Sequence, residues 1–124
     1  MGRGNPIRVL IADAQSKVRS ALRLVLEQQP DIQVLGEAVD GRGAIDWALA
    51  ACPDLILLDW DLCVRQEPDL VSRLNEICPD AIVVALSARP EAAQAAMEAG
   101  ADDFVSKGDQ PQRLLAVLER LHRL

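Results

Sequence analysis

Four polar residues in this sequence each stand at the end of an expected strand, and together they could act on phosphate beside a metal ion. They are Asp13, Asp59, Ser87 and Lys107. Two neighbouring carboxylates repel each other, so a nearby cation is needed for both to be ionised without a large energetic cost. Magnesium is the natural candidate, because it takes oxygen ligands and needs only one or two carboxylates together with phosphate oxygens. The hydroxyl and the ammonium group are both suited to phosphoryl oxygens.

These residues come together if the segments that precede them are strands of one parallel sheet. Residues 55–58 and 81–86 are continuously apolar, which is typical of parallel strands covered on both faces. Residues 7–12 are interrupted only by Arg8, and a short strand is expected at residues 103–106. In open α/β sheets, ligands bind at the carboxyl ends of the strands. We therefore expect all four polar residues to lie on one rim of the sheet.

The segments between these strands show the periodicity of amphipathic helices. Residues 32–38 are expected to form a less uniform strand, which suits the edge of a sheet. The expected helices are one capped by Ser16, one capped by Asp40, one starting at Pro68, one nearly all alanine over residues 90–99, and one after Asp109. Five such strand–helix units predict an α/β fold with right-handed crossovers. The pattern alone leaves either doubly wound strand order open.

Length and composition limit the class of protein. A chain of 124 residues, half of them hydrophobic, is expected to form one domain with a well-filled core. We expect residues 1–5 to be disordered. The longest apolar runs are far below the ~18 residues of a membrane span, and no signal peptide is recognisable. A net charge of −6 argues against nonspecific binding of nucleic acid, and no glycine-rich nucleotide-binding loop follows the first strand.

The three cysteines are expected to be structural. Cys52, Cys63 and Cys78 are odd in number, lie far apart and form no C-x-x-C pair. We predict buried free thiols in a reducing cytoplasm, and no metal ligation.

Four short sequence segments, taken in their order along the chain, resemble the receiver domain of bacterial two-component response regulators. The resemblance covers nearly the whole chain. The segments are residues 7–13, the apolar segment ending in Asp59, Ser87-Ala88, and residues 100–107. The first segment is most similar to the NarL/FixJ-type subgroup, which carries a helix-turn-helix output. The resemblance implies a flavodoxin-like (CheY-like) three-layer α/β/α fold, with a doubly wound five-stranded parallel sheet in the order 2-1-3-4-5. It also implies a single receiver domain over residues 1–124, with any output domain outside this chain.

The resemblance assigns chemistry to the rim residues. Asp59 would accept a phosphoryl group from a phosphohistidine on a sensor histidine kinase, and Lys107 would help to clamp the product. Mg²⁺ would be held by Asp13, Asp59 and the position of Asp61. Positioning and electrostatics supply most of the catalysis in such transfers. No enzyme activity is expected beyond self-phosphorylation from small donors and autodephosphorylation.

The family also implies a switch and a set of partners. Ser87 would move toward the phosphorylated Asp59, and Phe104 would swing into the vacated space, so that a partner or output domain is controlled. The output is expected to regulate transcription, with DNA contacted only through a domain outside this chain. We expect a cytoplasmic protein without a membrane partner, and a homodimer remains open.

Three departures from the family pattern leave two classes of function open. Ala14 stands where the family has a second acid that binds the metal directly, although the Asp61 carboxylate could compensate. Residues 62–64 replace the usual Met-Pro-Gly in the loop after Asp61, and Phe104 replaces the commoner Tyr. A phosphorylatable receiver is the first interpretation. The alternative is a pseudo-receiver, which is a protein-interaction module that works without phosphorylation.

Overall fold

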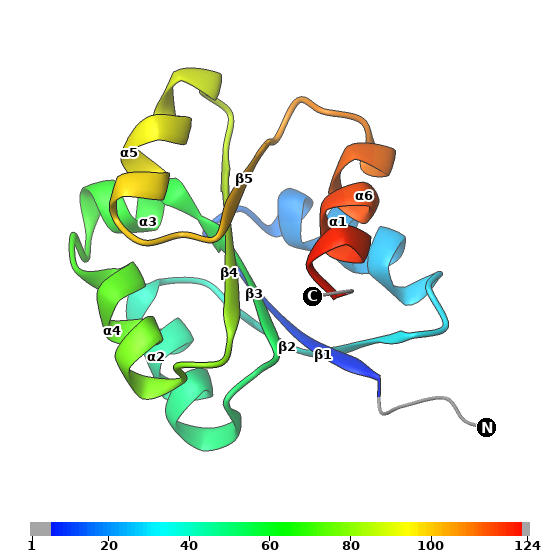
Figure 1. Cartoon of the computed structure of the whole chain (residues 1–124), viewed down its shortest axis with the longest axis horizontal. Helices are drawn as coiled ribbons and strands as arrows, with labels where there is room; N and C mark the ends of the chain where they lie inside the picture. The colour runs from blue at the N-terminus through cyan, green and yellow to red at the C-terminus, as the bar shows by residue number, and fades with distance from the viewer. Residues whose placement is uncertain (1–5, 123–124) are drawn as a thin grey trace.

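A parallel β-sheet lies between two layers of helices in this computed structural model, which describes residues 6–122 and the side chains as far as residue 120 (Figure 1). The strands are β1 (Ile7–Ala12), β2 (Ile32–Ala38), β3 (Leu55–Asp59), β4 (Ile82–Ser87) and β5 (Asp103–Ser106). All pairings are parallel and the order is β2-β1-β3-β4-β5. The predicted fold class and strand order are therefore confirmed. The disorder expected for residues 1–5 lies outside the described residues.

The helices divide between the two faces of the sheet. One layer holds α1 (Ser16–Glu27) and α6 (Pro111–His122). The other holds α2 (Gly41–Ala51), α3 (Trp60–Arg65), α4 (Leu70–Ile77), the 3₁₀ turn η1 (Pro90–Ala92) and α5 (Ala93–Glu98). Among the described residues, no helix combines the length and the apolar character needed to cross a bilayer.

The core consists of two apolar clusters, one on each face of the sheet. Successive side chains of a strand point to opposite faces, so each strand contributes to both clusters. The cluster facing α2–α5 includes Leu10, Ile56, Leu58, Val83 and Ala85. The cluster facing α1 and α6 includes Val9, Ile11, Leu57, Val84 and Leu86. Because all of β3 is buried, its last residue, Asp59, is held in a fixed position at the rim.

The segment after β3 differs most from the prediction. We expected a loop at residues 62–64 and one helix from Pro68, but α3 begins directly after Asp59 and a second helix, α4, begins at Leu70. The Asp59 carboxylate itself caps α3, because it accepts a hydrogen bond from the Asp61 N–H at 3.0 Å. Leu62 is buried in the core cluster, which fixes the helix against the sheet.

The helix caps were partly predicted. Asp40 caps α2 as expected, with its Oδ1 accepting a hydrogen bond from Gly43 N at 2.8 Å. The prediction for Ser16 was wrong, because Gln15 occupies the cap position of α1 and makes no side-chain hydrogen bond there. Ser16 is instead the first residue of the helix.

The cysteine prediction was wrong for two of the three residues. Cys52 and Cys78 form a disulfide, with their Cα atoms 5.5 Å apart and a separation of 26 positions in sequence. Each follows the last residue of a helix, α2 and α4 respectively, and these helices pack against each other. The pairing is thus created by the packing of two helices, and the sequence spacing gives no sign of it. Cys63 is a buried free thiol, as predicted.

Candidate functional site

The predicted rim residues lie at the carboxyl ends of adjacent strands. Asp13 follows β1, Asp59 ends β3, Ser87 ends β4 and Lys107 follows β5. The exposed fractions of Asp13, Asp59 and Ser87 are 0%, 2% and 1%. Among the residues whose side chains the structure describes, these three are the only polar or charged ones that are buried. Buried polar groups are costly, so three of them along one edge indicate a functional site.

One ammonium group joins the two carboxylates. The Nζ atom of Lys107 lies 2.8 Å from Oδ2 of Asp13 and 3.2 Å from Oδ1 of Asp59. The backbone N–H of Lys107 donates to the Ser87 carbonyl at 2.8 Å, which holds the end of β5 beside β4. The Lys107 side chain is only 13% exposed, so these ion pairs are largely shielded from solvent. Two carboxylates with one ammonium leave this edge with a net negative charge.

The charge imbalance shows in the pKa values. Burial raises the pKa of Asp13 and the charge of Asp59 adds to this effect, while the contact with Lys107 and the Gln15 N–H act against it. For Lys107, burial disfavours the charged form, but contact with Asp13 and the charges of both carboxylates outweigh it, so its pKa is raised. The lysine has two anionic partners, whereas Asp13 shares one cation. Lys107 is therefore a firmly charged ammonium.

A chain of ion pairs supports the loop that carries Asp13. Arg19 of α1 donates to the Asp13 carbonyl at 2.7 Å and pairs with Glu37 of β2 at 3.0 Å. Arg23 reaches the other oxygen of Glu37 at 2.6 Å. The Gln15 N–H donates to Asp13 Oδ1 at 2.8 Å. We did not predict the role of Arg19 and Glu37 from the sequence, since both are ordinary polar residues of half-exposed elements.

Neutralising Glu37 should weaken this support in a pH-dependent way. The hydrogen bond from Arg23, opposed by burial and aided by Arg19, lowers the pKa of Glu37 from its usual 4.5. Its stabilising contribution is therefore present above pH 4.5 and is lost as the pH falls through the lowered pKa. We expect Glu37→Gln to reduce the free energy of unfolding by about 1 kcal/mol at neutral pH. Urea unfolding of both proteins as a function of pH measures this.

Glu27→Gln is the matched control for that measurement. Glu27 pairs with Arg23 but is more than half exposed, and it belongs to α1 without touching the loop that carries Asp13. We expect this variant to unfold nearly as the parent does. Equal effects of the two substitutions, or a Glu37 effect that does not decline as the pH falls from 4.5 through the lowered pKa of Glu37, would contradict the proposed support.

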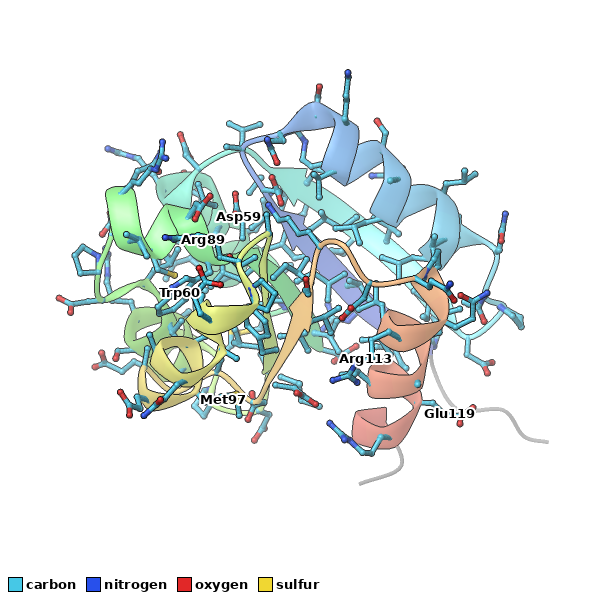
Figure 2. The ribbon with its side chains drawn as sticks, turned by 90° about the horizontal axis from the view of Figure 1, so that it is seen from above. Asp59, Trp60, Arg89, Met97, Arg113 and Glu119 are labelled. Carbon is cyan, nitrogen blue, oxygen red and sulfur yellow. A yellow bond between two sulfur atoms is a disulfide. The ribbon has the colours of Figure 1, made fainter. Side chains whose placement is uncertain are left out.

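Asp61 lies outside the cluster around Lys107. Its Oδ1 atom is 3.4 Å from the Arg89 guanidinium, and both side chains are substantially exposed. The Arg89 N–H donates to the Ser87 Oγ at 3.0 Å. Figure 2 shows Asp59, Trp60 and Arg89 on one side of the molecule, above the ends of the strands. Sequence reasoning did not anticipate this position of Arg89 over the rim.

The remaining predicted residue, Phe104, lies on β5 opposite Ala85 of β4. It is half-buried and packs against the core cluster that faces α2–α5. In the register of β4 and β5, Ser87 pairs with Ser106, which lies two residues after Phe104. The two predicted switch residues thus lie on neighbouring strands, with Ser87 at the end of β4 and Phe104 two register positions before it.

The residues on the rim fit a magnesium ion only in part. Oδ2 of Asp13 is buried and has the Lys107 ion pair but no well-aligned hydrogen bond, and the two buried carboxylates outnumber the one ammonium. Both observations favour a further cation beside Asp13 and Asp59. However, the part of the chain that the structure describes gathers no three His, Cys, Asp or Glu side chains able to hold a metal. The Asp61 carboxylate does not join the other two.

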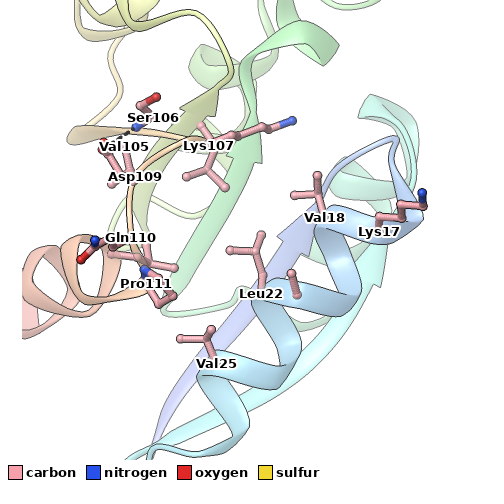
Figure 3. Close-up of a pocket in the computed structure, with 13 residues that line it drawn as sticks. Lys17, Val18, Leu22, Val25, Val105, Ser106, Lys107, Asp109, Gln110 and Pro111 are labelled. Carbon is pink, nitrogen blue, oxygen red and sulfur yellow. Dashed lines mark hydrogen bonds between the residues drawn. The ribbon is translucent and has the colours of Figure 1, made fainter.

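An apolar cavity of about 270 Å³ opens beside the site, between α1 and the segment that leads from β5 into α6 (Figure 3). Val18, Leu22 and Val25 line it from α1, and Val105 and Pro111 line it from the other side. Lys107 also belongs to its lining. Of the apolar residues that recur along one face of α1, only Leu26 is fully buried, and the other four line this cavity, namely Val18, Ala21, Leu22 and Val25.

Comparisons with known proteins identify the family of this chain. The family described as the response regulator receiver domain matches residues 9–119. A protein-glutamate methylesterase/protein-glutamine glutaminase from Geobacter sulfurreducens is 37% identical over 82% of this chain and 29% of that protein. The nitrate/nitrite response regulator protein NarL of Escherichia coli is 30% identical over 97% of this chain and 56% of that protein.

A solved structure shows the same fold. A chain from the crystal structure of the P1 domain of CheA3 in complex with CheY6 from R. sphaeroides has a TM-score of 0.87 and 26% identity. The match covers 98% of this chain and all of that chain. The chain spans about a third of the length of the methylesterases that it matches and about half of NarL. NarL among its relatives agrees with the predicted subgroup. This chain belongs to the response regulator receiver domain family.

Proposed function

We propose that Asp59 accepts a phosphoryl group from a phosphohistidine on a sensor histidine kinase. The observation that carries this proposal is the burial of Asp13, Asp59 and Ser87 on one edge, with Lys107 bridging the two carboxylates. A structural ion pair would not require two buried carboxylates for one ammonium group. The arrangement suits a site that must receive additional cationic and phosphoryl groups.

The transfer breaks the N–P bond of the donor and forms an O–P bond on Asp59, while the released imidazole takes a proton from water. Oδ1 of Asp59 already accepts the Asp61 N–H and contacts Lys107. No hydrogen bond in the described part of the chain is made to Oδ2, so we assign Oδ2 as the attacking atom. Lys107 then faces the new negative charge. The chemistry that Mg²⁺ supplies, when held by Asp13 and Asp59, is neutralisation of the phosphoryl oxygens.

Ser87 and Phe104 are proposed to carry the signal away from Asp59. The Ser87 Oγ accepts a hydrogen bond from Arg89 N–H, which leaves its own proton free to donate to a phosphoryl oxygen. The phosphoryl group adds about 1.5 to 2 negative charges at neutral pH. The following α5 is rich in alanine, and its one large apolar residue, Met97, is substantially exposed. Such a helix buries little area and is free to shift when Ser87 moves.

The phosphodonor is proposed to dock at the cavity between α1 and α6. Its walls are apolar, and Lys107 connects it to the phosphoacceptor site. An amphipathic helix seated there would bring a histidine on its surface toward Asp59. The solved complex of a CheA3 P1 domain with CheY6 is consistent with a receiver binding such a domain.

The output is proposed to be transcriptional, through a domain outside this chain, because NarL matches over nearly the whole of the sequence. The chemistry of the chain itself is confined to gaining and losing its own phosphoryl group, and methylesterase activity belongs to the relatives that carry that name. We propose the cytoplasm as the location, since the kinase domains that phosphorylate receivers act there.

Incubation with acetyl phosphate and Mg²⁺ tests the phosphoacceptor directly. We expect intact mass spectrometry to show a gain of one phosphoryl group, which EDTA prevents and Asp59→Asn abolishes. Asp61→Asn is the matched control and should still be labelled, because its carboxylate lies outside the Lys107 cluster. Labelling of the Asp59→Asn variant at another residue would refute the assignment.

A pseudo-receiver is the second candidate, and Ala14 favours it. Ala14 is exposed and offers no ligand beside Asp13, and among the described residues no third carboxylate joins the pair. A pseudo-receiver would gain no mass with acetyl phosphate or with its kinase, and it would bind no Mg²⁺. It would use the same fold to bind a partner constitutively.

A further inference from the structure

The Cys52–Cys78 disulfide lies at the edge of the sheet opposite Asp59. Cys52 follows the last residue of α2 and lies shortly before β3, and Cys78 follows the last residue of α4 and lies shortly before β4. Asp59 closes β3 at its other end, after five residues of strand, a distance of roughly 15 Å. The disulfide is therefore spatially separate from the proposed phosphorylation site.

The two sulfur atoms differ in accessibility. Cys52 is exposed, whereas Cys78 is 3% exposed. An external thiolate can thus reach the Sγ of Cys52, and the Cys78 sulfur is then the leaving group. The asymmetry directs the attack to one end of the disulfide, as thiol–disulfide exchange requires access to the attacked sulfur.

The surroundings accommodate the reduced pair as well as the disulfide. The Sγ of Cys78 lies 3.4 Å from the Ala48 carbonyl, and the Sγ of Cys52 lies 3.6 Å from the Ile77 carbonyl. Each carbonyl can accept a hydrogen bond from the thiol formed on reduction. Neither sulfur would be left as a buried group without a partner.

The backbone at Cys52 is held in place independently of the disulfide. Arg8 donates to the carbonyls of Ala51 and Cys52, at 3.0 and 2.7 Å. Its backbone N–H also donates to the Asp54 carboxylate at 2.8 Å. Cys52 has a left-handed φ of 40°, which a residue with a Cβ rarely adopts, and these contacts hold it there. The Cβ of Cys52 therefore keeps its direction toward α4 after reduction, so that the disulfide can form again.

The third cysteine does not compete for pairing. Cys63 lies in α3 and is only 2% exposed. An external thiol or disulfide therefore has no access to its sulfur, as exchange requires. Cys52 and Cys78 are left as a defined pair.

We propose that Cys52 and Cys78 are a reversible redox modification site, opened by a dithiol reductant of the thioredoxin class. One thiolate of the reductant attacks the Cys52 sulfur, and the Cys78 sulfur leaves and takes up a proton. The second thiol of the reductant then attacks its own mixed disulfide, which releases the Cys52 thiol. The reductant becomes a disulfide and the chain gains two thiols. This inference rests on the proposed cytoplasmic location, where a disulfide is usually transient or redox-sensing.

Equilibration with mixtures of reduced and oxidised dithiothreitol tests the site. Samples are quenched in acid, alkylated in denaturant and weighed by mass spectrometry. We expect one alkylated cysteine, Cys63, at the oxidising end and three at the reducing end, through a single two-electron transition that reverses on reoxidation. Reduction should lower the melting temperature by about 10 °C, since it removes a cross-link over 26 residues.

Variants separate the pair from the rest of the chain. Cys63→Ser is the matched control and should keep the transition and the melting shift. The double variant Cys52→Ser/Cys78→Ser should lose both and should melt like the reduced parent, with circular dichroism establishing that it folds. Three alkylated cysteines at every ratio, or a small-thiol adduct on Cys52 without internal pairing, would overturn the proposal.

The same samples keep this inference distinct from the phosphoacceptor proposal. Labelling of Asp59 by acetyl phosphate should be equal in the oxidised and reduced protein, because the two sites lie at opposite ends of β3. Absence of labelling in both states contradicts the phosphoacceptor proposal and leaves the redox site standing. Absence of a redox transition with intact labelling contradicts only the redox site.

Discussion

Replacing Lys107 with methionine is expected to lower the free energy of unfolding by about 3–5 kcal/mol at neutral pH, because it leaves two buried carboxylates without a cation. Nζ of Lys107 contacts both Asp13 and Asp59, and the latter two are almost fully buried. The pKa of Lys107 is raised above its usual 10.5. Its contribution is therefore fully present below pH 10.5 and is lost as the pH rises through the raised pKa. Urea unfolding over this pH range measures the difference.

Further measurements separate the stability lost through unpaired charge from the stability lost through changed packing. Asp13→Asn in the Lys107→Met background removes one of the orphaned charges and should recover part of the stability. Added Mg²⁺ should also stabilise the Lys107→Met variant more than the parent, because the ion replaces the missing positive charge. Lys17→Met is the control, since Lys17 is an exposed lysine on the rim of the neighbouring cavity. A Lys107→Met variant as stable as this control would mean that the carboxylates are not held by the ammonium.

Simple features of the sequence predict the position of the four rim residues, Asp13, Asp59, Ser87 and Lys107. Continuous apolar runs predict buried parallel strands, and parallel strands place their carboxyl ends on one edge. The sequence alone therefore places Asp59 and Lys107 on the same rim. It does not define which atoms they contact, because each contact depends on the reach of the lysine and on the register of β4 and β5.

The features that were missed depend on contacts between elements distant in sequence. The end of β3 is also a helix cap, so α3 starts where an apolar strand pattern stops and a loop was expected. Cys52 and Cys78 meet because α2 and α4 pack together, and no local spacing encodes that contact. Arg19 is one of two arginines on an amphipathic helix, and only the position of β2 beside α1 makes it a support for Asp13.

Replacing Ala14 with aspartate is expected to tighten Mg²⁺ binding by about tenfold or more, because it adds a third carboxylate beside Asp13. Trp60 follows Asp59 directly and is nearly buried, so its fluorescence should report the titration. A Trp47→Phe background removes the other emitter. Without Mg²⁺, the additional charge should repel the two existing carboxylates, so the variant should be less stable than the parent and should gain more stability from the ion.

Ser16→Asp is the charge-matched control, since it adds the same charge two residues further along, at the start of α1. It should leave the affinity nearly unchanged if direct ligation by residue 14 is the cause. Equal gains in the two variants would mean that general electrostatic attraction limits binding. If the Asp61 carboxylate already replaces the missing acid, Ala14→Asp should bring little gain and Asp61→Asn should weaken the parent. That result would require Asp61 to leave Arg89, from which it now lies 3.4 Å, and to turn toward Asp59.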